Sequence, residues 1–146
     1  MLTAGQILKT KQHKDIHAVS TEMTVLEAAR LMAEKRIGAL LVMKDNKTIG
    51  IVTERDYLQR FAPMNRLPSE TLVREIMSSP LIHVSPNEDA KSCLALMAER
   101  QFRRLPVVES GNVVGLISMS DMLREIPAQQ QFVITQLERY IRGDMG

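Results

Sequence analysis

The chain has 146 residues, 45% of them hydrophobic and 25% charged, with a formal net charge of +2. That length fits one domain or two small units with a shared interface, and the apolar share suffices for a sizeable core. Balanced charge, 3% aromatic residues and no Trp exclude an obligatory nucleic-acid partner, which would require clustered Lys and Arg and stacking side chains.

The first half of the chain predicts a small unit of mixed helix and strand. Its elements, in order, are a strand at Val19, a helix capped by Thr24, strands at Ala39–Met43 and Ile49–Val52, and a helix that begins near Thr53. Thr24 and Glu27 have the spacing of a capping box, and the apolar residues after them recur at helical spacing. The two apolar runs flank a polar turn, which predicts a hairpin.

A linker and a short helix are predicted next. Pro63 and Pro68 bound a segment that is typical of a linker, because proline stops helices on both sides. Residues Leu72–Met77 then predict a short helix that leads into the second half of the chain.

The second half repeats the first with a spacing of 65 residues. The clearest matches are Val19-Ser20 with Val84-Ser85, Leu31–Glu34 with Leu96–Glu99, and Gly50–Asp56 with Gly115–Asp121. The elements predicted again are a helix capped by Asp89, strands at Leu105–Val108 and Val113–Ile117, and a helix from Ser118. Cys93 falls on the apolar stripe of the first of these helices, which favours a buried small side chain over a reactive thiol.

Beyond the repeat, residues Ala128–Arg142 predict one more amphipathic helix. Because this helix has no counterpart in the repeat, it either covers the body of the protein or joins an oligomer interface. No apolar run is long enough to cross a bilayer, and the N-terminus lacks the layout of a signal peptide. Together with a single cysteine, these features predict a cytoplasmic protein without a membrane partner.

One motif, Gly-apolar-apolar-(Thr/Ser)-x-x-Asp, occurs in both halves, at Gly50–Asp56 and at Gly115–Asp121. A hydroxyl at a helix N-terminus lies among unpaired backbone N–H groups, which attract an anion such as phosphate. An Asp one turn further along can accept hydrogen bonds from two sugar hydroxyls, and Gly lets the backbone approach closely. For one copy alone, a helix cap with a first-turn acid is the favoured interpretation. Two copies, each within a whole repeated unit, favour a nucleotide.

Motifs of catalysis and metal binding are missing from the sequence. It contains no GxxxxGK, GxGxxG, HExxH or paired CxxC, and its three histidines do not have a metal-ligand spacing. The sequence therefore predicts a protein that is not an enzyme and that has no metal site. A nucleotide hydrolase is the alternative, and it would need a base or a metal near the phosphates.

In tandem, the helix, the PVV-type strand and the Gly-to-Asp motif resemble a pair of CBS (cystathionine-beta-synthase) domains. Gly50–Asp56 and Arg103–Val108 carry the resemblance most specifically, and it covers Gly5–Ile126. It implies an α/β fold of the α+β type, with two β-α-β-β-α repeats about a pseudo-twofold axis and an added C-terminal helix. The expected boundaries are 5–62 for the first repeat, 63–71 for the linker, 72–126 for the second repeat and 127–146 for the C-terminal helix and tail.

The resemblance also implies a ligand and its contacts. The family binds adenosyl ligands such as AMP, ADP, ATP, NAD, NADH or S-adenosylmethionine between its repeats, and its pairs commonly form homodimers or larger assemblies. The matching positions are Ala18, Gly38, Ala39, Ile51, Thr53, Arg55 and Asp56 in the first copy, and Ser78, Ile82, His83, Arg103, Arg104, Leu116, Ser118, Ser120 and Asp121 in the second. Asp56 and Asp121 are expected to take the ribose, and Thr10 is a loose counterpart of Ser78.

The two copies differ where the base pocket is expected. Gly38 and Ala39 of the first copy correspond to Arg103 and Arg104 of the second. Guanidinium groups match phosphate oxygens, so the ligand's phosphates are expected toward these arginines, whereas the competing interpretation places them in solvent. His83 is expected to narrow the second base pocket and not to bind a metal.

These observations favour a regulatory sensor of an adenine nucleotide, reporting energy or redox state to an effector protein that the sequence does not identify. The alternatives are a scaffold or oligomerisation module with vestigial sites, and a module for S-adenosylmethionine.

Overall fold

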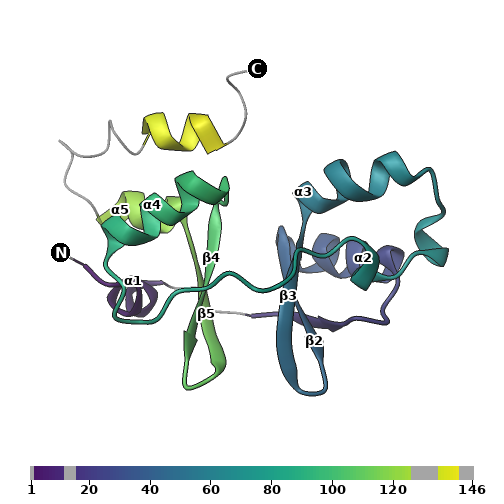
Figure 1. Cartoon of the computed structure of the whole chain (residues 1–146), viewed down its shortest axis with the longest axis horizontal. Coiled ribbons are helices and arrows are strands. Elements are labelled where there is room, and N and C mark those ends of the chain that lie inside the picture. The colour runs from purple at the N-terminus through teal and green to yellow at the C-terminus, as the bar shows by residue number, and fades with distance from the viewer. Residues whose placement is uncertain (1, 12–15, 126–134, 142–146) are drawn as a thin grey trace. The chain divides into compact units, whose positions relative to one another are not determined.

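The chain divides into two units, which Figure 1 shows as a ribbon. This computed structural model describes residues 2–11, 16–125 and 135–141. The first-repeat unit comprises Ile16–Ile82, and the second-repeat unit comprises Met1–Asp15 together with His83–Gly146. The segment Met1–Asp15, which includes the start of the predicted first repeat (5–62), therefore belongs to the unit of the second repeat.

The first-repeat unit is built on a three-stranded sheet. Its elements are β1 (Ala18–Ser20), α2 (Val25–Lys35), β2 (Ala39–Lys44), β3 (Lys47–Thr53) and α3 (Glu54–Asp56), after which the chain stays helical through a π-helix (Tyr57–Phe61) and a 3₁₀ turn (Ala62–Met64). The strand order is β1-β2-β3, with β1 parallel to β2 and β2 antiparallel to β3. The predicted order of strand, helix, hairpin and helix is therefore confirmed in this unit.

Helix α2 covers one face of that sheet. The buried side chains between them are Val25, Ala28 and Met32 of α2 and Leu40, Val42 and Val52 of the hairpin. Alternate residues of a strand share a face, which is why these hairpin positions lie on the side of α2. Two further 3₁₀ turns follow, Pro68–Glu70 and Val73–Glu75, and Val73 and Ile76 complete the core with no exposed surface. The short helix predicted over Leu72–Met77 is thus a single 3₁₀ turn.

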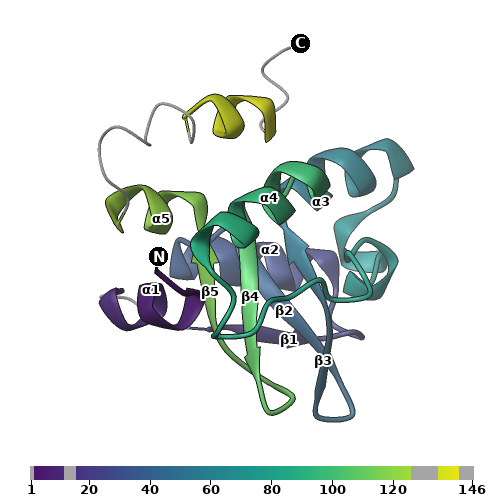
Figure 2. The ribbon, with the colours of Figure 1, turned by 60° about the vertical axis from the view of Figure 1, so that its left-hand side comes forward.

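The second-repeat unit has a two-stranded sheet with helices packed on it. Its elements are α1 (Ala4–Thr10), α4 (Ala90–Arg100), β4 (Arg104–Glu109), β5 (Asn112–Ser118) and α5 (Met119–Glu125), and residues 135–141 are also helical. Figure 2 shows α4 alongside the β4–β5 hairpin. Val84 forms only an isolated bridge with Val107, so the first strand of the predicted repeat is reduced to one bridge in this copy.

Caps and turns recur at equivalent positions of the two units. Thr24 accepts a hydrogen bond from the Glu27 backbone N–H at 3.0 Å, and Asp89 accepts one from the Ser92 N–H at 2.7 Å. The predicted helix starts are thus confirmed. The hairpin turns have positive φ at both central residues, namely Asp45 and Asn46 in one hairpin and Ser110 and Gly111 in the other. This backbone twist suits a tight two-residue hairpin.

Helix α1 is part of the core of the second-repeat unit. Ala4, Ile7 and Leu8 are buried with residues of α4, β4, β5 and α5. Ile141, within the helical residues 135–141, is fully buried in the same core. The burial of Ile141 fits the first of the two roles expected for the C-terminal helix, which is to cover the body of the protein. Much of the predicted range Ala128–Arg142 lies outside the described residues. Cys93 is also fully buried there, as predicted, and burial raises the pKa of its thiol to about 11.

Candidate functional site

The first corner, defined by Thr53, Asp56 and Ser78, forms where β3 ends and α3 begins. Asp56 Oδ2 accepts hydrogen bonds from the Thr53 backbone N–H at 2.9 Å and from the Thr53 hydroxyl at 3.1 Å. The Ser78 hydroxyl donates to Asp56 Oδ1 at 3.1 Å. Asp56 is only 6% exposed, so these donors offset the cost of burying its carboxylate. The corner is a buried carboxylate held by hydroxyl and amide donors.

Other predicted residues of the first copy gather at the same end of the sheet. Strand register places Ala18 and Ile51 on either side of Leu41, and Ala39 opposite Thr53. The Gly38 carbonyl accepts from the Glu54 N–H at 3.1 Å, which attaches the start of β2 to the start of α3. Ser78, which was expected in the second copy's site, lies instead at the first corner, because its backbone exchanges two hydrogen bonds with Ile51, at 2.8 and 3.0 Å.

The second corner, defined by Ser118, Asp121 and Lys11, has a different set of partners. Asp121 Oδ2 accepts from the Ser118 N–H at 2.8 Å, as the equivalent atom does in the first corner. Lys11 places its Nζ 2.9 Å from the same oxygen and also donates to the Leu116 carbonyl at 2.7 Å. Arg124, one turn along α5, donates to Asp121 Oδ1 at 2.7 Å. This carboxylate is therefore held by two cations.

The ionisation of Asp121 reflects these partners. Burial pushes the pKa of Asp121 upward, but the hydrogen bond and charge of Lys11 and the Ser118 backbone N–H outweigh it. The pKa of Asp121 is consequently below its ordinary value of 3.8. The carboxylate stays charged at neutral pH although it is 6% exposed.

The remaining predicted residues of the second copy lie at the start of β4 or on the surface. Arg104, the first residue of β4, pairs with Ser118 across the hairpin. Arg103 donates to a Glu138 carboxylate oxygen at 3.1 Å. Exposed side chains belong to His83, Arg103, Arg104 and Ser120, and to Arg55 of the first copy, whereas Ile82 and Leu116 are half-buried. A phosphate contact by Arg55, Arg103 or Arg104 stays a prediction.

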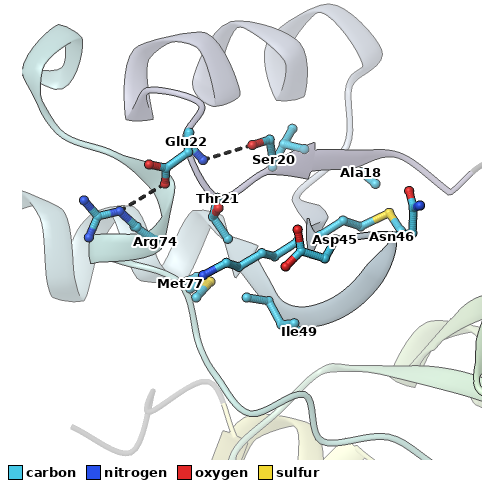
Figure 3. Close-up of a pocket in the computed structure, with 12 residues that line it drawn as sticks. Ala18, Ser20, Thr21, Glu22, Asp45, Asn46, Ile49, Arg74 and Met77 are labelled. Carbon is cyan, nitrogen blue, oxygen red and sulfur yellow. Dashed lines mark hydrogen bonds and ion pairs between the residues drawn. The ribbon is translucent and has the colours of Figure 1, made fainter.

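A cavity of about 920 Å³ opens in the first-repeat unit on the half of the sheet next to the β2–β3 turn (Figure 3). Its walls include Ala18, Ser20, Met43, Ile49, Arg74 and Met77. Arg74 donates to Glu22 at 3.1 Å, so the lining contains an ion pair beside apolar side chains. Ala18 lines this cavity, and in the sheet it pairs with Leu41, which in turn pairs with Ile51. The cavity lining also reaches Met77, which directly precedes Ser78 of the corner, while Asp56 does not line the cavity.

Two residues that contact Asp121 in the second corner, Lys11 and Arg124, are not predicted from the sequence. Arg124 lies three residues after Asp121 on one helix, so helical spacing could have indicated it. Lys11 gives no such signal, because it lies upstream of Asp15, where the register between the two copies is lost. The loose counterpart proposed for Ser78, Thr10, instead donates its hydroxyl to the Ile7 carbonyl within α1 at 2.7 Å.

The described residues contain neither a candidate metal site nor a membrane-spanning helix. In the ranges 2–11, 16–125 and 135–141, no three His, Cys, Asp or Glu side chains are grouped so that they could hold a metal ion. None of the helices in this part of the chain is both long and apolar enough to span a membrane.

Known proteins similar to this chain share both its sequence pattern and its fold. The CBS domain-containing protein YhcV of Bacillus subtilis is 34% identical over 115 residues, which is 79% of this chain and 81% of that protein. The mitochondrial CBS domain-containing protein CBSX3 of Arabidopsis thaliana is 31% identical over 85% of this chain, but the match spans only 63% of that protein. A solved CBS-domain protein from Burkholderia ambifaria is 42% identical with a TM-score of 0.81, covering 89% of this chain and 97% of that one.

Two further similarities concern enzymes and assembly. Inosine-5'-monophosphate dehydrogenase of Thermoplasma acidophilum is 32% identical over 75% of this chain, yet the match covers only 21% of that enzyme. A hexameric CBS-CP12 protein of bloom-forming cyanobacteria has a TM-score of 0.74 at 25% identity, with 97% of each chain covered.

The CBS domain family itself matches the chain twice, over residues 5–63 and 73–128. These segments contain every residue of both corners, and they leave out most of the linker. The chain belongs to the CBS domain family and carries two CBS domains in tandem.

Proposed function

We propose that this protein is a regulatory module that binds an adenine nucleotide, such as AMP, ADP, ATP, NAD or NADH, and signals its occupancy by a change of conformation. The observation that carries the proposal is the first corner, where a carboxylate that is 6% exposed already accepts hydrogen bonds from two hydroxyl groups. The cis-diol of a ribose offers the same kind of donor. Family membership supports this class of ligand, because CBS pairs are regulatory modules that bind adenosyl ligands.

The first copy supplies groups for both the sugar and the base. Asp56 and Thr53 would hold the ribose, and Ala18, Ala39 and Ile51 would line the adenine. Support comes from strand register, which brings Ala18, Ala39, Ile51 and Thr53 to one end of the sheet, and from the hydrogen bond of Asp56 to the Thr53 N–H. In the second copy Ser118 and Asp121 occupy the equivalent positions.

Regulation requires that the ligand bind one conformation better than another, since a ligand with equal affinity for both shifts nothing. We propose that an effector protein or a second copy of this chain responds to that shift. The chain would act without catalysis, and the similarity to inosine-5'-monophosphate dehydrogenase supports this, because it covers only a small part of that enzyme. The hexameric cyanobacterial relative supports self-association into a dimer or a larger assembly.

Titration calorimetry tests the proposal. AMP, ATP, NAD, NADH and S-adenosylmethionine are titrated separately into the chain, and at least one of the four nucleotides is expected to bind stoichiometrically. Asp56→Asn should weaken that binding about tenfold or more, because a hydrogen bond to a charged group contributes about 1.5–3 kcal/mol. The matched control is Glu34→Gln, an equally conservative change at an exposed position of α2, and its affinity should equal that of the wild type.

Three results would contradict the proposal. One is the absence of binding by all four nucleotides, and another is unchanged binding by the Asp56→Asn variant. Binding of S-adenosylmethionine alone would replace the proposed ligand class. Native mass spectrometry of the same samples reports the number of chains in the assembly and the mass of any bound nucleotide.

A further inference from the structure

We infer that the two corners are not equivalent, and that Lys11 occupies the second one so that a nucleotide binds only at the first in the wild-type chain. This inference rests on the proposed function, and it names which of two repeated motifs carries it. Its basis is a comparison of the two corners atom by atom, each within its own unit.

Lys11 occupies hydrogen-bonding positions that belong to Ser78 and Thr53 in the first corner. There, the Ser78 N–H donates to the Ile51 carbonyl at 2.8 Å, and the Thr53 hydroxyl donates to Asp56 Oδ2 at 3.1 Å. The Ser78 hydroxyl donates to the other carboxylate oxygen, Oδ1, at 3.1 Å. In the second corner, Lys11 Nζ donates to the Leu116 carbonyl at 2.7 Å and lies 2.9 Å from Asp121 Oδ2. Leu116 and Asp121 are the repeat equivalents of Ile51 and Asp56. One ammonium group therefore occupies the hydrogen-bonding positions of the Ser78 amide and the Thr53 hydroxyl.

The positive charge of Lys11 changes what a ligand must displace from the second carboxylate. A ribose hydroxyl can exchange with the Ser78 hydroxyl at Asp56 without separating charges. At Asp121 it would have to displace an ammonium and so separate two opposite charges, and a neutral hydroxyl does not replace their attraction. The side chains of Lys11 and Asp121 are 19% and 7% exposed, so water screens their attraction poorly.

The other cations near the two carboxylates strengthen the contrast. Arg124 bonds the second oxygen of Asp121 at 2.7 Å, so both oxygens of that carboxylate have a cationic partner. In the first corner Arg60 places its Nε 3.7 Å from Asp56 and donates a hydrogen bond to the Met77 carbonyl at 2.7 Å. Asp56 is thus held mainly by neutral donors.

Helix α1 holds Lys11 in place. Lys11 directly follows this helix, and its backbone N–H donates to the Leu8 carbonyl at 3.2 Å. Ile7 and Leu8 are buried in the core of the second-repeat unit. Release of Lys11 from Asp121 therefore has to break a partly buried ion pair while α1 keeps the lysine close to it.

The experiment counts nucleotides per chain by titration calorimetry, with AMP and NAD as separate probes. The wild type should bind one equivalent, and Asp56→Asn should lose it. Lys11→Met and Lys11→Gln keep most of the side-chain volume but remove the charge, and each should bind a second equivalent. Adding Asp121→Asn to Lys11→Met should remove that second equivalent. Lys9→Met, a charge removal at an exposed position of α1, should titrate as the wild type does.

The possible failures are distinguishable. Two equivalents in the wild type, or no second equivalent in either folded Lys11 variant, would overturn the inference and leave the proposed function standing. Binding that is lost in Asp121→Asn and retained in Asp56→Asn would overturn this inference and also the role of Asp56 in the proposed function. Absence of binding in every variant would overturn the proposed function as well. Circular dichroism of both Lys11 variants establishes that the comparison is made between folded chains.

Discussion

Glycine is required at two equivalent positions of the repeat for two different reasons. A Cβ on Gly50 would lie 2.6 Å from the Ser78 carbonyl oxygen, which also accepts a hydrogen bond from the Ile51 N–H at 3.0 Å. A Cβ on Gly115 would lie 2.6 Å from a methyl group of Leu8. The first obstacle is backbone that is tied to β3, whereas the second is the end of a side chain. Glycine therefore leaves room for a backbone carbonyl at Gly50 and for the Leu8 side chain at Gly115.

Alanine substitutions at the two glycines should consequently differ in cost. We expect Gly50→Ala to lower the free energy of unfolding by about 3 kcal/mol and Gly115→Ala by about 1 kcal/mol, within the range for overpacked sites. Urea unfolding at pH 7 measures both. Because Gly50→Ala moves Ser78 away from Asp56, it should also weaken nucleotide binding. Equal destabilisation by the two variants would show that the Ser78 backbone can withdraw freely.

The ion pair at Asp121 predicts a loss of stability in acid. Its pKa is lower in the folded chain than the ordinary 3.8, so its contribution is complete above that value and disappears as the pH falls through the folded pKa. The charged groups facing it are Lys11 and Arg124. At pH 7 the wild type should exceed Asp121→Asn by about 1–3 kcal/mol in free energy of unfolding.

At pH 3 that difference between the wild type and Asp121→Asn should be clearly smaller. Urea unfolding at both pH values supplies the measurement, and Glu34→Gln serves as the control with little difference from the wild type at either. A difference that is constant with pH would mean that the charge of Asp121 contributes nothing to stability.

At the scale of elements, helix α1 should stabilise one unit selectively. Ile7 is 1% exposed and packs with residues of α4, β5 and α5. Ile7→Ala should lower the free energy of unfolding by about 2–4 kcal/mol, because it leaves a cavity in that core. Hydrogen exchange should then accelerate in β4 and β5 more than in β2 and β3. Faster exchange confined to β2 and β3 would contradict the assignment of α1 to the second-repeat unit.

Elements with strong local signals could be predicted from the sequence. Thr24 and Asp89 carry side chains that accept from backbone N–H groups, and the turn residues of both hairpins tolerate positive φ. The first strand of the second copy could not be predicted in its observed form. Whether Val84 extends its pairing with β4 beyond one bridge depends on tertiary packing, which a single-sequence pattern does not contain.

At the scale of the whole molecule, the 65-residue repeat predicts the positions of both motif carboxylates, but not the difference between their surroundings. Asp56 and Asp121 follow directly from the register of the two copies. Lys11 could not be found in this way, because it is far in sequence from its partner and outside the repeated register. The assignment of α1 is likewise a long-range property. Sequence periodicity reports contacts within an element, whereas these contacts join segments more than a hundred residues apart.

The discontinuous second-repeat unit has a consequence for synthesis of the chain on the ribosome. Residues 16–82 form a contiguous unit that can fold as soon as they have emerged, while α1, translated earlier, must wait for β4 and β5. During that interval Ile7 and Leu8 have no core to enter. We therefore expect nascent chains arrested before β4 to expose an apolar helix face that chaperones can bind, and this exposure to end once β5 has left the exit tunnel.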